Sequence, residues 1–284
     1  MPQDARGQAE TTLPVPRSPV GQAGLAALAQ HPGRALIALD YDGTLAPIVS
    51  DPMAARPHPG AIAALRRLAP RAGTLAVITG RPAREAVALG GLDQIPGLIV
   101  LGQYGRQRWE AGTFTAPPAP PGVDTARREL PAVLAAAGAP KGTWTEDKGD
   151  ALAVHTRRAA DPDQALDRLR APLADLAARA DLAVQPGRMV IELRPPGGDK
   201  GTALKGLRSE RDARAVMYCG DDLGDGPAFE AVAELRASGI PGLAVCSGSP
   251  EVTGLADLAD LVVDGPDGVV ALLDALAAAF AGQA

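Results

Sequence analysis

Two aspartates stand one residue apart behind an apolar run. The run Ala35–Leu39 has the composition of a buried strand, and Asp40 and Asp42 follow it, with Gly43 and Thr44 directly behind. Side chains two residues apart in an extended chain point to the same side, and parallel sheets bind ligands at the edge where their strands end. Two carboxylates so close repel each other unless a cation separates them, commonly Mg²⁺. The pattern predicts a metal-assisted phosphoryl-transfer site.

Further polar residues follow a second apolar run and open a later helix. Residues 74–78 have the composition of a buried strand that ends at Thr79, Gly80 and Arg81. Thr79 can offer its hydroxyl to a phosphate oxygen, and Gly80 lets the backbone approach a bound group. Lys200, one of four lysines, can stabilise charge on a phosphoryl group. Alone, a Thr-Gly-Arg turn or a lysine is more often structural than functional.

Carboxylates also gather behind a third apolar run. Residues 215–219 are followed by Gly220, Asp221 and Asp222, with Asp225 three residues later. Glycine permits a tight turn at this point. Aspartate-rich turns can hold Ca²⁺, but the Asp-x-Asp-x-Asp spacing of an EF-hand loop is absent. We therefore expect this turn to meet the first aspartate pair at the same sheet edge.

Together these segments resemble the four motifs of the haloacid-dehalogenase-like phosphatases. The motifs are Asp40-Tyr41-Asp42-Gly43-Thr44, Ile78-Thr79-Gly80-Arg81, Lys200 and Gly220-Asp221-Asp222. The resemblance implies that Asp40 attacks phosphorus to form an aspartyl phosphate, while Asp42 acts as general acid and base. It further implies that the catalytic residues are Asp40, Asp42, Thr79 and Lys200. The Mg²⁺ ligands it implies are Asp40, the backbone carbonyl of Asp42, and Asp221. It leaves two roles for Asp222 and Asp225, which either bind Mg²⁺ through water or hold Lys200.

Within that superfamily, the sequence is similar to trehalose-6-phosphate phosphatases. The segments that carry this likeness are residues 39–48, Glu146-Asp147-Lys148-Gly149, His155-Thr156-Arg157, Ile191-Glu192-Leu193-Arg194-Pro195 and Asp199-Lys200-Gly201. The resemblance implies a hydrolase of carbohydrate metabolism that releases phosphate from trehalose 6-phosphate during trehalose biosynthesis. The residues it assigns to the substrate are Thr79, Gly80, Arg81, Glu146, Lys148, His155, Arg157 and Glu192, with Arg188 or Arg194 as further sugar contacts. From the residues alone, Glu146 to Lys148 also fit a solvated loop and His155 a structural histidine.

The sequence departs from the family pattern in two places. Members usually carry Thr and Glu at the positions of Gly224 and Gly226, beside the predicted metal site. They also tend to have Asn-x-Gly followed by Glu where this chain has residues 102–106 and Gln107. The second departure weakens the case for sugar contacts in that segment.

Alternating apolar strands and helices predict an α/β fold with a Rossmann-like parallel-sheet core and an inserted α+β cap. Expected strands cover residues 35–39, 74–78, 98–101, 152–155, 189–193, 215–219, 242–246 and 261–263; expected helices cover residues 21–30, 61–68, 82–89, 124–137, 162–180 and 269–280, with one after Lys200 and one between the strands at 215 and 242. The expected domains are a disordered arm at 1–22, a core at 23–108 and 197–284, and the cap at 109–196. Four prolines make residues 47–59 an irregular loop beside the site.

Composition narrows the class of protein. The net charge of −5 over 284 residues, with no block of basic residues, argues against nucleic-acid binding. Two cysteines indicate neither a disulfide scaffold nor a zinc site, and no apolar stretch reaches membrane-spanning length. A cytoplasmic enzyme acting on a small sugar phosphate is the default expectation. Three alternatives stay open: a phosphatase for sucrose 6-phosphate, one for mannosyl-3-phosphoglycerate, and a catalytically silent partner that binds or regulates a trehalose-phosphate synthase.

Overall fold

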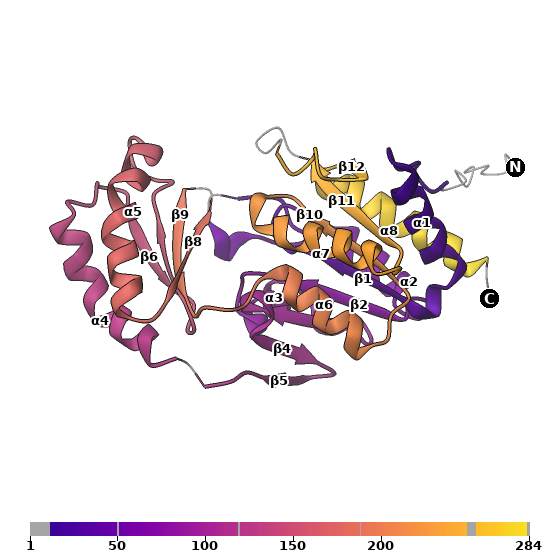
Figure 1. Ribbon diagram of the computed structural model, residues 1–284, viewed down its shortest axis with the longest axis horizontal. Coiled ribbons are helices and arrows are strands. Elements are labelled where there is room, and N and C mark those ends of the chain that lie inside the picture. Colours follow the sequence, from indigo (N-terminus) through magenta and orange to yellow (C-terminus); the bar gives the residue numbers. More distant parts are fainter. Residues whose placement is uncertain (1–11, 50, 119, 188, 249–253, 283–284) are drawn as a thin grey trace, which may run out of the picture.

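A large sheet and a small sheet organise the molecule (Figure 1). The computed structural model describes residues 12–49, 51–118, 120–187, 189–248 and 254–282. The large sheet has the order β12 (Leu261–Asp264), β11 (Gly242–Gly248), β10 (Ala215–Gly220), β1 (Ala35–Leu39), β2 (Thr74–Ile78), β3 (Ile99–Gly102), β4 (Gln107–Glu110) and β5 (Thr113–Thr115). Its first six strands are parallel, and β4 and β5 add antiparallel to one edge. The predicted parallel α/β core is confirmed.

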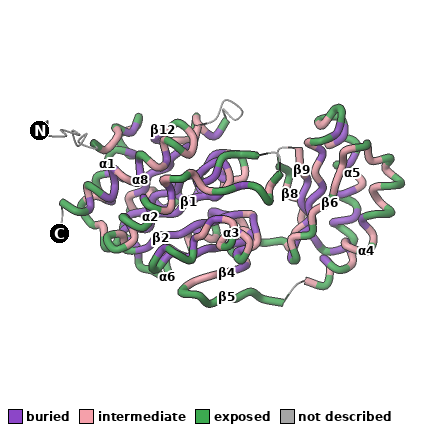
Figure 2. Tube along the Cα trace, turned by 180° about the vertical axis from the view of Figure 1, so that it is seen from behind, coloured by how far each residue is buried: buried purple, intermediate pink, exposed green. Residues whose placement is uncertain are grey.

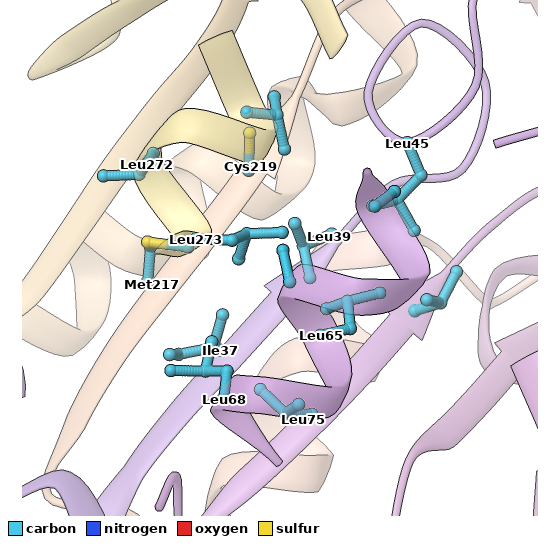
Figure 3. Packing of buried hydrophobic residues seen from close by; sticks show 14 of the residues in the cluster. Ile37, Leu39, Leu45, Leu65, Leu68, Leu75, Met217, Cys219, Leu272 and Leu273 are labelled. Atoms are coloured by element: carbon cyan, nitrogen blue, oxygen red, sulfur yellow. The ribbon is translucent and has the colours of Figure 1, made fainter. Parts of the chain in front are cut away.

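Helices cover both faces of the large sheet. One face carries α1 (Pro19–Gln30), α2 (Ala61–Leu68), α3 (Ala83–Gly90) and α8 (Gly265–Ala281), and the other carries α6 (Lys200–Glu210) and α7 (Gly226–Ala237). Every residue of β1 and β2 is buried, because strands covered on both sides can be apolar throughout. Figure 3 shows Ile37 and Leu39 of β1 packed with Leu65 and Leu68 of α2 and Leu273 of α8.

The small sheet forms the inserted cap. It has the order β6 (Trp144–Asp147), β7 (Leu152–His155), β9 (Val190–Arg194) and β8 (Ala183–Gly187), all antiparallel. Helices α4 (Pro121–Ala136) and α5 (Pro162–Arg179) pack on one face over a buried cluster of their own. The opposite face turns toward the large sheet (Figures 1 and 2). The alternation of β7 and β9 therefore sends one set of side chains into the cap and the other toward the core.

The predicted disordered arm is wrong for its last four residues, because α1 begins at Pro19. Ser18 caps this helix by accepting a hydrogen bond from the backbone N–H of Gly21 at 3.0 Å. Its hydroxyl also donates to Asp260 Oδ1 at 2.7 Å, which ties the start of the helix to the core. Residues 1–11 of the predicted arm lie outside the described residues.

The predicted start of the cap, residue 109, falls inside β4. Strands β4 and β5 pair with each other and, through β3, with the large sheet, which therefore continues to Thr115. In the described parts of the chain, no helix is both long and apolar enough to cross a membrane.

Candidate active site

Neighbouring strands deliver the predicted catalytic residues to one edge. Because β1 lies between β2 and β10, the residues that follow these strands, Asp40, Thr79 and Asp221, come out side by side. All three are buried. Lys200, the first residue of α6, reaches Asp40 with 2.9 Å between Nζ and Oδ1. The structure thus brings together the nucleophile candidate and the cation that the sequence assigned to it.

Asp225 holds Lys200 from the other side. Its Oδ1 accepts hydrogen bonds from Lys200 Nζ at 2.7 Å and from the Tyr218 hydroxyl at 2.6 Å. Its Oδ2 accepts from the backbone N–H groups of Asp221 at 3.0 Å and Asp222 at 3.3 Å. Burial alone would lower the pKa of Lys200, but the negative charges of Asp225 and Asp40 raise it. The ammonium therefore stays charged. Of the two roles predicted for Asp225, the structure displays the contact with Lys200.

Three carboxylates form a cluster that could hold a metal ion. Oxygens of Asp40, Asp221 and Asp225 lie within 4.8 Å of one another. Burial, followed by the charge of Asp40, raises the pKa of Asp221 to about 9. A buried, all-oxygen donor set with this repulsion fits a hard divalent cation. Gly43 makes room for the Asp221 carboxylate, since a Cβ there would lie 2.0 Å from Asp221 Oδ2.

The glycine departures leave this cluster intact. A Cβ at Gly226 would meet no atom within 4 Å, and one at Gly224 would lie 2.9 Å from Asp222 Oδ1. Asp222 instead uses Oδ1 to accept the backbone N–H of Gly224 at 2.8 Å, and it caps the short turn that ends at Asp225. The turn is thus built from its aspartates and the backbone.

Asp42 lies with Arg81 rather than in the metal cluster. Arg81 donates from Nε to Asp42 Oδ2 and from Nη2 to Oδ1, both at 2.7 Å. It also donates to Glu85 at 2.8 Å and to the carbonyl of Pro52 at 2.9 Å, in a single turn of 3-10 helix within the proline-rich loop. That loop therefore does lie beside the site. The guanidinium predicted to bind substrate is committed to two carboxylates in this structure.

Tyr104 is a site residue that sequence reasoning missed. A Cβ at Gly80 would lie 2.8 Å from the Tyr104 hydroxyl, so this glycine permits the contact. The Arg194 guanidinium lies 4.5 Å from the centroid of the tyrosine ring. Burial, followed by the charge of Glu192, raises the pKa of Tyr104 to about 12. Tyr104 has φ of 59°, and the departure from the family pattern at residues 102–106 was the signal that could have drawn attention to it.

Four predicted sugar contacts share the open face of the cap sheet. Lys148 donates to Glu192 Oε2 at 2.6 Å, while Oε1 of Glu192 is buried without a partner among the described residues. His155 Nε2 lies 2.8 Å from Glu146 Oε2. Arg157 is partly exposed, with no hydrogen bond or ion pair to the described part of the chain. Arg188 lies outside the described residues.

A polar contact joins the core to the cap, and sequence reasoning missed it as well. Gln107 accepts the backbone N–H of Ala83 at 2.9 Å through Oε1 and donates through Nε2 to Asp150 Oδ2 at 3.2 Å. Asp150, in the turn between β6 and β7, also accepts from Arg106 at 3.3 Å. The only sequence signal for this contact was Gln107, at a position where the family tends to have glutamate.

The model of the trehalose-phosphatase family matches residues 38–264. The chain belongs to the trehalose-phosphatase family. The match spans both sheets, so the strand-end carboxylates and the polar cap face described above fall within the family's extent.

Individual relatives agree with this family. A trehalose-phosphate phosphatase of Mycobacterium avium is 37% identical over 238 residues, 78% of this chain and 56% of that protein. One of Mycobacterium marinum is 36% identical over 210 residues, 70% and 52% of the two chains. This trehalose-phosphatase family member thus spans about half the length of these curated relatives. The C-terminal domain of Candida albicans trehalose-6-phosphate phosphatase shares the fold, with a TM-score of 0.73 and 23% identity over 94% of this chain and 99% of that one.

Proposed function

We propose that this chain hydrolyses trehalose 6-phosphate to trehalose and inorganic phosphate, in two steps through a phosphoryl group on Asp40. The observation that carries the proposal is the buried contact between Asp40 and Lys200, at a sheet edge faced by a polar cap surface. The curated relatives at 36–37% identity are named trehalose-phosphate phosphatases, which supports the choice of substrate.

In the first step, a carboxylate oxygen of Asp40 attacks phosphorus and the bond from phosphorus to the sugar oxygen breaks. Asp42 gives a proton to that leaving oxygen, so trehalose departs neutral. Asp42 pairs with Arg81 in the structure, and proton transfer therefore requires it to exchange this contact for the substrate. Its carboxylate is 40% exposed, which leaves it room to turn.

In the second step, water attacks the phosphoryl group and the bond from phosphorus to Asp40 breaks. Asp42 takes a proton from that water, which restores both carboxyl groups for the next cycle. Lys200 and the Thr79 hydroxyl offset the charge of the phosphoryl oxygens during both steps. The fixed pairing of Lys200 with Asp225 keeps the ammonium oriented without reorganisation.

The cation proposed for this cluster is Mg²⁺. Asp40, Asp221 and the backbone carbonyl of Asp42 would hold it, with Asp222 near enough to act through water. When bound, the ion supplies positive charge that offsets the carboxylates and the phosphate they receive.

The cap face supplies the sugar contacts in this proposal. A disaccharide presents many hydroxyl groups, which charged side chains bind by donating and accepting together. Glu146, Lys148 and Glu192 have that chemistry on one face, and Oε1 of Glu192, which has no partner in the described parts of the chain, is an acceptor for a hydroxyl. Association with a trehalose-phosphate synthase and a cytoplasmic location stay predictions from the sequence.

Phosphate release from a panel of esters tests the function. The purified chain with Mg²⁺ is expected to release phosphate from trehalose 6-phosphate far faster than from sucrose 6-phosphate, mannosyl-3-phosphoglycerate or glucose 6-phosphate. The Asp40→Asn variant is expected to release none above background. A preference for another ester would replace the substrate. Failure on every ester would favour the catalytically silent partner.

A further inference from the structure

Two aromatic rings lie stacked on the open face of the cap. Trp144 of β6 and His155 of β7 are direct cross-strand partners. Their ring centroids are 3.9 Å apart and their planes differ by 6°. The guanidinium of Arg158 lies 5.3 Å from the centroid of the tryptophan ring. Stacking holds the imidazole in one plane, and its ring nitrogens lie in that plane.

The fixed imidazole meets Glu146. His155 Nε2 lies 2.8 Å from Glu146 Oε2, and the two side chains are 16% and 18% exposed. Burial would raise the pKa of Glu146, but the hydrogen bond from His155 and the charge of Lys148 together lower it. Glu146 is therefore held as a carboxylate in one orientation.

The two glutamates on this face share a pattern. In Glu192, Oε2 accepts a hydrogen bond from the Lys148 ammonium and Oε1 has no partner among the described residues. In Glu146, Oε2 is engaged by His155, and no described residue makes a hydrogen bond to Oε1. One oxygen of each carboxylate is thus anchored by the protein while the other stays available. The contact between His155 and Glu146 accounts for this arrangement without a direct contact between His155 and a sugar.

We propose that His155 is a positioning residue, pinned by Trp144, that aims the free oxygen of Glu146 at a sugar hydroxyl. His155 then acts on the substrate through Glu146, in place of the direct contact expected from the sequence. This inference rests on the proposed function, because it assumes that the cap face receives the sugar.

A double-mutant cycle tests it. Steady-state kinetics with trehalose 6-phosphate are measured for wild type, His155→Ala, Glu146→Gln and the double variant. A hydrogen bond to a charged group corresponds to roughly tenfold or more in binding. We expect His155→Ala to raise KM about tenfold with kcat nearly unchanged, and to change KM less than about twofold once Glu146 is already Gln. His155→Gln, which keeps a donor, is expected to recover most of the loss.

Two further measurements keep the outcomes distinct. Trp109→Phe leaves Trp144 as the sole tryptophan, so its fluorescence reports trehalose binding without turnover, and His155→Ala is expected to weaken that binding. His31→Ala, on an exposed histidine after α1, is the matched control and is expected to change neither quantity.

An equal loss from His155→Ala in both backgrounds, or no loss in either, would overturn the inference. A wild-type chain that binds trehalose but releases no phosphate would refute the proposed function alone, and the cycle would then be read from fluorescence. Absence of both trehalose binding and phosphate release would refute both proposals.

Discussion

Both carboxylate oxygens of Asp225 accept hydrogen bonds from other groups of the protein. Lys200 and the Tyr218 hydroxyl occupy one oxygen, and two backbone N–H groups occupy the other. All four groups are donors, so an amide nitrogen in place of either oxygen would face a donor. Its geometry makes Asp225 the residue that orients Lys200 and shapes the turn that presents Asp221.

Asp225→Asn is therefore expected to lower kcat by at least about 100-fold and to cost about 3 kcal/mol of folding free energy, because it sets an amide nitrogen against a donor and removes one of the two carboxylates that pair with the buried Lys200 ammonium. Activity assays and urea unfolding measure the two effects. Asp40→Asn is the control. It removes activity without a comparable loss of stability, because burial already raises the pKa of Asp40 and disfavours its charge. Equal stability losses in both variants would contradict this assignment.

The pKa of Asp221 gives a test of the metal site. In the cation-free protein its folded pKa is about 9, above the ordinary value of 3.8, so its contribution to stability is full below about pH 4 and is lost as pH rises toward 9. Binding of Mg²⁺ would offset the stability that the fold loses when Asp221 deprotonates. We expect Mg²⁺ to raise the melting temperature, more at pH 8 than at pH 6, and to have no effect on Asp221→Asn. Thermal denaturation at both pH values measures this effect. A rise in melting temperature with Mg²⁺ that is the same at pH 6 and pH 8 would contradict the assignment of Asp221 to the metal site.

At the scale of elements, the contact between β4 and the β6–β7 turn depends on an amide. Gln107 uses its carbonyl oxygen on the α3 backbone and its nitrogen on Asp150. A glutamate there would set two carboxylates against each other. Gln107→Glu is expected to destabilise the protein by about 1–2 kcal/mol, and adding Asp150→Asn is expected to restore most of it. Melting temperatures of the wild type and the two variants check this, and a double variant no more stable than the single one would count against the contact.

The elements also show what could be predicted from sequence. Strands β1 and β2 and helix α2 have the predicted bounds, because buried runs and a clean helical pattern leave few alternatives. Strands β4, β5, β6 and β8 are short, partly exposed and mixed in composition, so no period marks them. Predicted helix ends shifted by up to four residues, as for α8, which begins at Gly265.

The site divides in the same way. Asp40, Lys200 and Asp221 were predictable because each follows or opens an apolar element within a recognisable motif. Tyr104 and Asp150 were not, because their roles come from contacts between segments distant in sequence. The departures from the family pattern at residues 102–107 mark the region but do not identify those contacts. The pairing of Asp42 with Arg81 was equally invisible, since both residues carried other assignments.

At the scale of the molecule, Asp260 joins the N-terminal helix to the far end of the sheet. Its carboxylate accepts from Ser18, Arg236 and the backbone N–H of Ala244, and its carbonyl accepts from Arg17. Asp260→Ala is expected to cost about 3 kcal/mol, because it leaves Arg236 without its carboxylate partner. kcat is expected to stay unchanged, since the strand ends proposed to be catalytic lie elsewhere. Urea unfolding beside phosphate-release assays would reveal any coupling between the two.

The division of labour between the two sheets has an evolutionary consequence. Asp40, Thr79 and Asp221 follow three adjacent strands of the large sheet, whereas Glu146 and Glu192 belong to the small one. Under the proposed function, substitutions on the small sheet would change which sugar is accepted without altering the residues proposed to carry out phosphoryl transfer. We expect selection for a new sugar substrate to change residues of β6, β7 and β9 first.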